Sequence, residues 1–266
     1  SYAADGPLDA NDLIWSWIEK SALAVSNYYG RFPVPAIAVR VIFQDGRGVR
    51  GGRTYPGDVP DIEVRIGRAS TADDLLIRDW VMVHEMVHLA FPWMDLKHNW
   101  MAEGLAVYVE SIARVQAGHL TREQVWGEFS RMMPHGLPKP DDQGLDVTVN
   151  WGRTYWGGAL FCLLADVRIR QATANRRGLQ HALRAINARR DFRRLWDFRE
   201  TLAIGDAGTR TDVLVTQYDE MGRNPVAIDL EALWENLGVV KVDEGIEISD
   251  HAVLASTRHA IESPST

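Results

Sequence analysis

The sequence predicts an α+β protein in which strands come first and helices follow. Two segments before residue 70 alternate apolar and polar residues, as strands do, whereas the chain from residue 100 onward carries mainly the apolar repeat of helices. With 266 residues, 46% of them hydrophobic, the chain is long enough to bury a full core. We expect an N-terminal α/β lobe over 1–100, a helical lobe over 101–239 and a polar C-terminal tail over 240–266, with a cleft where the lobes meet.

The N-terminal lobe is expected to contain two helices and two strands. The first helix ends before Gly30, and the second begins at Ser70 or Thr71, whose hydroxyls can cap it, and stops before Pro92. The second strand has a polar outer face and is therefore predicted at the edge of the sheet. In chain order, the segments are a helix over 12–29, a strand over 36–43, a glycine-rich turn over 45–57, a strand over 61–67 and a helix from 70 or 71 towards 90.

The second half of the chain is predicted to be mainly helical. The apolar periodicity indicates helices over 102–117, 121–133, 154–171, 177–188 and 229–236. The segment 134–150, with three prolines and two glycines, is the longest predicted loop. The tail has weak strand character only, at 240–242 and 246–248.

Composition and charge exclude several classes of protein. A net charge of −7 argues against general binding to nucleic acid or to anionic membranes, and the ten arginines within 168–199 alternate with apolar residues, as on a solvated helix face. No apolar stretch reaches the roughly 18 residues of a membrane span. The single cysteine, Cys162, permits neither an internal disulfide nor a cysteine-rich zinc site. Residues 1–5 suit a mature chain after signal removal, so we expect a secreted or periplasmic protein, with a cytoplasmic one as the alternative.

A short motif at the end of the N-terminal lobe predicts a metal site. His84-Glu85-Met86-Val87-His88 has the H-E-x-x-H pattern, in which histidines four residues apart project from one face of a helix. Two imidazoles placed in this way can bind a single Zn²⁺. Glu85 lies about 100° round the helix from His84, near enough to polarise a water without being a ligand. The alternative is a pair of histidines on a helix without a metal.

A carboxylate fifteen residues after the second histidine is the expected third ligand. Glu103 lies at the start of the next predicted helix, and two histidines with one glutamate are a known ligand set of catalytic zinc, with water in the fourth position. The small residues Gly104 and Ala106 suit a helix that packs tightly beside another. The alternative for Glu103 is an acid that the helix dipole favours in a first turn, without a metal. Glu110, seven residues on, is either an acceptor for the Nδ1–H of a ligand histidine or a solvated acid.

Together the two motifs resemble those of the gluzincin zinc metallopeptidases, the group that contains aminopeptidase N, glycyl aminopeptidase and compact peptidase-MA-like domains. Their second motif, W-x-x-E-G-x-A-x-Y-x-E, is matched at every fixed position. The matching residues are Trp100, Glu103, Gly104, Ala106, Tyr108 and Glu110. The resemblance implies a thermolysin-like, two-lobed catalytic domain with one zinc per chain. It also implies a role for Tyr155, which opens a Y-x-x-G-A-like helix start, as a donor to the oxyanion that forms in the reaction.

Two differences from these families bear on the substrate. The gap between the second histidine and the glutamate is shorter than in aminopeptidase N and in glycyl aminopeptidase. The sequence also has no G-x-M-E-N segment, whose glutamate grips the free amino terminus of the substrate in aminopeptidase N. Cleavage at internal bonds or of an unusual substrate is therefore favoured over general aminopeptidase action.

The sequence thus predicts a zinc-dependent peptidase that acts on peptides or proteins. His84, His88 and Glu103 are the expected metal ligands, and Glu85 is the expected general base, which later protonates the leaving amine. The strand over 61–67 is a candidate for holding an extended peptide by strand addition. Two alternatives remain open: a non-catalytic binding protein on a peptidase fold, and a zinc hydrolase of a non-peptide substrate.

Overall fold

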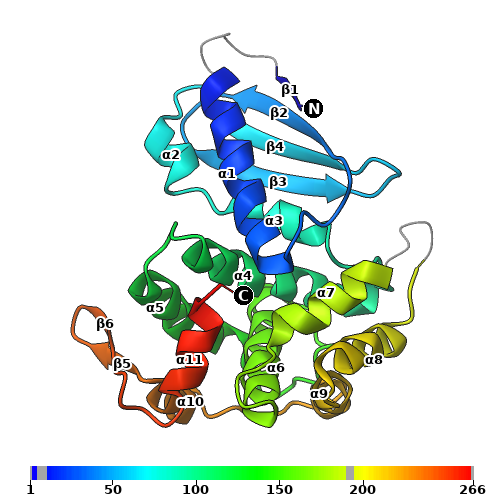
Figure 1. Cartoon of the computed structure of the whole chain (residues 1–266), viewed down its shortest axis with the longest axis vertical. Helices are drawn as coiled ribbons and strands as arrows, with labels where there is room; N and C mark the ends of the chain where they lie inside the picture. Colours follow the sequence, from blue (N-terminus) through cyan, green and yellow to red (C-terminus); the bar gives the residue numbers. More distant parts are fainter. Residues whose placement is uncertain (1, 5–10, 190–194, 265–266) are drawn as a thin grey trace.

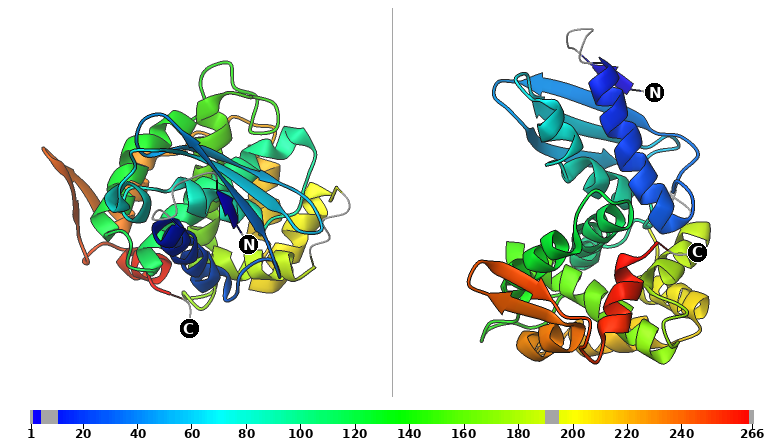
Figure 2. Two further views of the ribbon diagram at one scale, coloured as in Figure 1. Left: turned by 90° about the horizontal axis from the view of Figure 1, so that it is seen from above. Right: turned by 60° about the vertical axis from the view of Figure 1, so that its left-hand side comes forward.

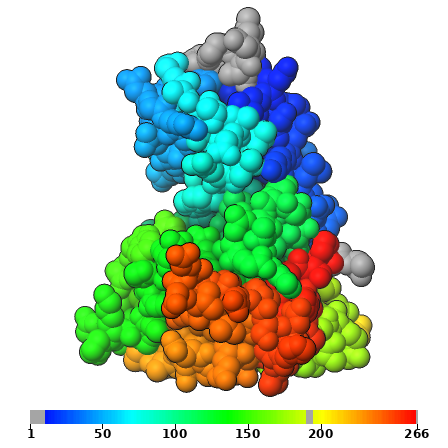
Figure 3. All heavy atoms as spheres, turned by 90° about the vertical axis from the view of Figure 1, so that its left-hand side faces the viewer, coloured from blue at the N-terminus to red at the C-terminus, as the bar shows by residue number. Residues whose placement is uncertain are grey.

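The protein has a small sheet with two flanking helices at one end and a larger group of helices at the other (Figure 1). The computed structural model describes residues 2–4, 11–189 and 195–264. The predicted α+β class is confirmed. We call β1 to α3 the sheet part and η2 to α11 the helical part, and the molecule narrows between them (Figure 3). No described helix is both long and apolar enough to cross a membrane.

The sheet part contains the first seven elements. They are β1 (Tyr2–Ala4), α1 (Asn11–Tyr29), β2 (Ala38–Gln44), β3 (Val49–Tyr55), β4 (Asp61–Gly67), α2 (Ala72–Leu76) and α3 (Val81–His88). The strands follow the order β1-β2-β4-β3, with β1, β2 and β4 parallel and β3 antiparallel to β4. Helix α1 lies across one face of this sheet (Figure 2). Its buried Trp17 belongs to the same apolar core as Val39 of β2 and Ile62 of β4.

The order of the strands corrects two predictions. Strand β4, predicted at the edge, lies between β2 and β3, and the segment predicted as a turn contains the true edge strand β3. Gly51 and Gly52 remove the apolar-polar alternation from β3, and its register with β4 shifts between Val49 and Gly51. Glycine weakens a strand, so β3 depends on its pairing with β4 rather than on its own side chains.

The single helix predicted from 70 or 71 towards 90 is two helices, α2 and α3. Thr71 caps α2 as predicted, in a reciprocal pair of hydrogen bonds with Asp74. The chain then leaves the helix, and Asp79 accepts hydrogen bonds from the backbone N–H groups of Val81 and Met82, which begins α3 in a new direction. The same carboxylate accepts a 2.8 Å bond from the indole of Trp17, so α1 fixes where α3 starts.

The helical part contains the remaining elements. They are η2 (Leu96–His98), α4 (Asn99–Gln116), α5 (Arg122–Met132), η3 (Met133–Gly136), the π-helical turn η4 (Gly152–Gly157), α6 (Gly158–Ala172), α7 (Leu179–Arg189), α8 (Phe198–Thr209), α9 (Val213–Met221), α10 (Leu230–Leu237), β5 (Val239–Val242), β6 (Gly245–Ile248) and α11 (Ala255–Glu262). The five predicted helices are present, whereas α8, α9 and α11 were not predicted.

The segment predicted as a polar tail is folded over most of its length. Its two weak strand signals form the antiparallel hairpin β5–β6, and α11 packs on the helices before it. Arg258 of α11 is completely buried and donates to the carbonyl oxygen of Leu237 at 2.8 Å. Glu262 accepts a 2.6 Å bond from the indole of Trp126. These contacts join α11 to α5 and α10.

Helices α4 and α6 cross with their backbones in contact. A Cβ on Gly104 would lie 2.2 Å from the carbonyl carbon of Gly158, and a Cβ on Gly158 would lie 2.0 Å from the carbonyl oxygen of Trp100. Neither position can hold a side chain unless the two helices separate. The predicted tight packing at Gly104 is therefore confirmed. Because Glu103 precedes Gly104 and Tyr155 lies one turn before Gly158, this crossing brings the two residues to the same place.

This crossing predicts that Gly104→Ala destabilises the protein although alanine is the better helix former. We expect the free energy of unfolding to fall by about 1–3 kcal/mol, the usual cost of overpacking. Urea unfolding followed by circular dichroism measures it. Gly127→Ala is the matched control, because a Cβ there meets only Ile246 at 3.7 Å, and it should stabilise by about 0.5–1 kcal/mol. Equal effects of the two substitutions would contradict the account.

Candidate active site

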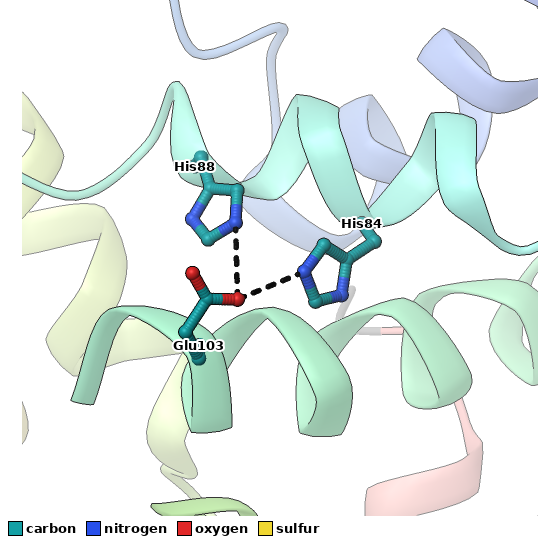
Figure 4. Close-up of side chains that lie close together, drawn as sticks. All are labelled: His84, His88 and Glu103. Carbon is teal, nitrogen blue, oxygen red and sulfur yellow. Dashed lines mark hydrogen bonds and ion pairs between the residues drawn. The ribbon is translucent and has the colours of Figure 1, made fainter. Parts of the chain in front are cut away.

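Three predicted metal ligands converge between α3 and α4. His84 and His88 project from one face of α3 because they are four residues apart, and Glu103 rises from the first turns of α4 to meet them (Figure 4). Oε2 of Glu103 lies 3.3 Å from Nε2 of His84 and 3.7 Å from Nε2 of His88. One ligand atom from each residue lies within 4.8 Å of the other two.

This cluster has the donor set and spacing of a zinc site. Ligand atoms about 2.0–2.1 Å from one tetrahedral ion are about 3.3 Å apart, close to the two distances observed. Burial, together with the charge of His84, lowers the pKa of His88 to about 4, so its ring is in the neutral form that binds a metal. Burial raises the pKa of Glu103, but the neighbouring histidines outweigh it and the pKa falls below its ordinary value, which keeps the carboxylate ionised.

The carboxylate of Glu85, which is not one of the three residues of the cluster, is hydrogen-bonded to the edge strand β3. Its Oε2 accepts a 2.7 Å hydrogen bond from Oγ1 of Thr54, which lies 2.8 Å from the backbone oxygen of Glu85 as well. A Cβ on Gly52 would lie 2.6 Å from Cγ of Glu85. Burial raises the pKa of Glu85, and the bond from Thr54 offsets part of the rise. A carboxylate that holds a proton more readily than usual suits a general base.

The cleft at this site has a volume of about 590 Å³. Strand β3, helices α3 and α4, and Tyr155 of η4 line it, and Tyr155 is hydrogen-bonded to Glu103. The pKa of Tyr155 is raised by burial and by the charge of Glu103, so its hydroxyl keeps its proton and can donate it in a hydrogen bond. Aromatic side chains of Trp80 and Trp93 also line the cleft. A larger hollow of about 1000 Å³, between α5 and the β5–β6 hairpin, contains none of the predicted site residues.

The structure does not give Glu110 the hydrogen bond to a ligand histidine that one reading predicted. Its carboxylate accepts bonds from Oγ of Ser111 at 3.0 Å and from Nη1 of Arg114 at 3.1 Å. The residue is buried, which also excludes the alternative of a solvated acid and raises its pKa to about 7. Nδ1 of His84 is buried without a hydrogen-bond partner among the described residues. Cys162 lies in the apolar core, as predicted.

Two residues at the site escaped the sequence analysis, namely Gly52 and Thr54. Both lie in the segment that was predicted as a turn, so no strand placed them beside the metal motif. The available signal was the run Gly51-Gly52, because glycines inside a strand often mark a close approach of another backbone or side chain.

Comparison with solved structures shows that the chain has a known fold. An aminopeptidase N family protein from Idiomarina loihiensis matches 94% of this chain with a TM-score of 0.58 and 12% identity. An M1 zinc metallopeptidase from Deinococcus radiodurans matches 86% with a TM-score of 0.53 and 14% identity, and a mutant of it, bound to the substrate Tyr-Ser-Ala, matches with a TM-score of 0.52 and 13% identity. No protein-family model and no curated protein sequence matches the chain.

The chain spans about half the length of these structures, since it covers 48–50% of each. Structural matches at such low sequence identity establish a shared fold only, and they leave substrates and partners open. The resemblance inferred from the two motifs is confirmed at this level: the chain has the fold of a peptidase domain found in M1 zinc metallopeptidases of the aminopeptidase N family.

Proposed function

We propose that this chain is a zinc-dependent peptidase, with the sheet part and the helical part acting as the two lobes of a thermolysin-like catalytic domain. The observation that carries the proposal is the convergence of His84, His88 and Glu103, with Glu85 beside them, in an open cleft. The zinc metallopeptidases with this fold support it. Glu85 favours a catalyst over a binding protein, because the proposed ligand set does not need it.

Each residue of the cleft has a task in this proposal. Zinc held by the cluster would supply Lewis acidity that activates a water and polarises the scissile carbonyl. Glu85 accepts the proton of the attacking water and later delivers it to the leaving amine. Tyr155, which lines the cleft beside Glu103, donates a hydrogen bond to the carbonyl oxygen as negative charge develops there. Strand β3, rather than β4, is the sheet edge along which an extended peptide pairs.

The charges of the cleft favour cleavage of internal bonds. Among the described residues that line it, the only carboxylates are Glu85 and Glu103, and both already have tasks. No third acid is left to pair with the free ammonium of a peptide. The lining also includes two exposed arginines, Arg50 and Arg53, with no ion pair to a described carboxylate. The M1 structure with Tyr-Ser-Ala shows that a relative in fold accepts a short peptide with a free amino terminus, so aminopeptidase action is the second candidate.

Removal of the third ligand tests the metal site. Glu103→Ala should weaken zinc binding by at least about 100-fold, because two histidines leave the ligand set incomplete. Isothermal titration with zinc measures the affinity. Glu235→Ala, an exposed acid on α10, is the control and should bind as the wild type does. An affinity within twofold of the wild type for Glu103→Ala would place the third ligand elsewhere.

A second substitution separates metal binding from chemistry. Glu85→Gln should keep the fold and the zinc while hydrolysis slows by about 10²–10⁴-fold, because an amide cannot accept the proton of the water. Steady-state kinetics on a cleaved peptide, with zinc analysis of the same preparation, measures both properties. Glu19→Gln, an exposed acid of α1, controls for loss of charge alone. Undiminished turnover by Glu85→Gln would remove Glu85 from the mechanism.

The preference for internal bonds is tested with matched peptides whose amino termini are free or acetylated. Because no free acid in the cleft pairs with an ammonium, we expect both forms to be cut at the same internal bond, with rates within about threefold. Mass spectrometry of the products gives the bond and the rate. Release of single residues from the free form only would instead establish an aminopeptidase.

A further inference from the structure

We infer that Thr54 is a positioning residue that gives the two carboxylate oxygens of Glu85 different tasks, an inference that rests on the proposed function. Thr54 would hold Oε2, so that Oε1 is the atom that takes the proton of the water. The two atoms have different surroundings. Oε2 lies 2.7 Å from Oγ1 of Thr54, whereas no side chain that the structure describes donates a hydrogen bond to Oε1; the backbone N–H of Thr54 also bonds to the carboxylate. Thr54 and Glu85 are 31 residues apart in sequence, so the contact depends on the tertiary fold.

The hydroxyl of Thr54 has one hydrogen and two possible acceptors on Glu85. It lies 2.7 Å from the carboxylate oxygen Oε2 and 2.8 Å from the backbone oxygen. A bond to an ionised acceptor is roughly twice as strong as one between neutral groups, so the hydrogen goes to Oε2 while Glu85 is charged. Once Glu85 has taken a proton on Oε1, Oε2 is still an acceptor. Thr54 therefore keeps the carboxyl group in one orientation through both proton transfers.

Gly52 leaves the space that this orientation requires. It lies two residues before Thr54, so both point to the same face of β3, the face that meets α3. A Cβ on Gly52 would lie 2.6 Å from Cγ and 3.0 Å from Oε1 of Glu85. Any larger residue would displace the carboxylate from the strand. Thr54 therefore holds Oε2 by a hydrogen bond, and the absence of a side chain at Gly52 leaves space beside Oε1.

Orientation is important here because a general base works only within hydrogen-bonding distance of the proton that it accepts. Glu85 is 7% exposed, so few waters compete with Thr54 for Oε2. Without the hydroxyl, only the backbone N–H of residue 54 still bonds to the carboxylate, so the carboxylate can rotate and lose part of the productive geometry. Misplacements of this kind lower the rate of the chemical step. The binding of substrate does not depend on this orientation. Thr54 should therefore affect kcat and leave KM almost unchanged.

The test compares Thr54→Val with Thr54→Ser. Valine has the shape of threonine and favours strands, so the thermal melt and the zinc content should remain those of the wild type. We expect Thr54→Val to lower kcat by about tenfold, equivalent to about 1.4 kcal/mol, with KM changed by less than twofold. Thr54→Ser keeps the hydroxyl and should recover kcat to within about threefold of the wild type. Unchanged kcat in Thr54→Val, or equal losses in both variants, would overturn the proposal.

A crystallographic readout that does not depend on activity accompanies the kinetics. In crystals of the wild type and of Thr54→Ser, the carboxylate of Glu85 should occupy one orientation, in which Oε2 accepts a hydrogen bond from the hydroxyl of residue 54. In Thr54→Val it should rotate or occupy two orientations. A single unchanged orientation in Thr54→Val would overturn the role of Thr54. If instead the wild type cleaves no peptide but the carboxylate moves as expected, the proposed function fails while the positioning by Thr54 stands.

Discussion

The site depends on close approaches that only glycine permits. Helix α3 provides His84, Glu85 and His88, and it lies between strand β3 and helix α4. On the side of β3, the missing side chain of Gly52 makes room for the carboxylate of Glu85. On the other side, α4 can present Glu103 beside Tyr155 because Gly104 and Gly158 allow the backbones of α4 and α6 to touch. A methyl group at Gly104 or Gly158 would push α4 and α6 apart, and one at Gly52 would displace the carboxylate of Glu85.

The same close packing brings the negative charges of Glu85 and Glu103 together in one site. Glu85 and Glu103 are both largely buried, and the charge of Glu103 contributes to the raised pKa of Glu85. His88, held in its neutral form, offers no compensating positive charge. A divalent cation between these groups would balance the two carboxylates and bind the imidazoles of His84 and His88. The arrangement of charges therefore agrees with the ligand geometry in indicating a metal ion.

The sequence predicted which residues meet in the cleft better than it predicted the sheet that supports them. His84, Glu85 and His88 follow from helix periodicity, and Glu103 follows from its place at a helix start, so local patterns were sufficient. Strand β3 was missed because Gly51 and Gly52 erase its alternation, and its loss in turn put β4 at the sheet edge. Helix α8 was missed for a related reason: Gly205 and Gly208 lower its helix propensity, yet Gly205 lies close against Leu214 of α9 and Gly208 close against Ala185 of α7. Glu110 is buried and pairs with Ser111 and Arg114 on its own helix instead of with a ligand histidine.

The most direct test of the account is the location of zinc in crystals of the full chain by anomalous diffraction at the zinc absorption edge. The account predicts one strong anomalous peak per chain, about 2.0–2.2 Å from Nε2 of His84, Nε2 of His88 and a carboxylate oxygen of Glu103. Glu85 should lie outside the coordination sphere, with its Oε2 still hydrogen-bonded to the hydroxyl of Thr54. A zinc-soaked crystal with no peak between α3 and α4, or a peak bound by Glu85 in place of Glu103, would contradict it.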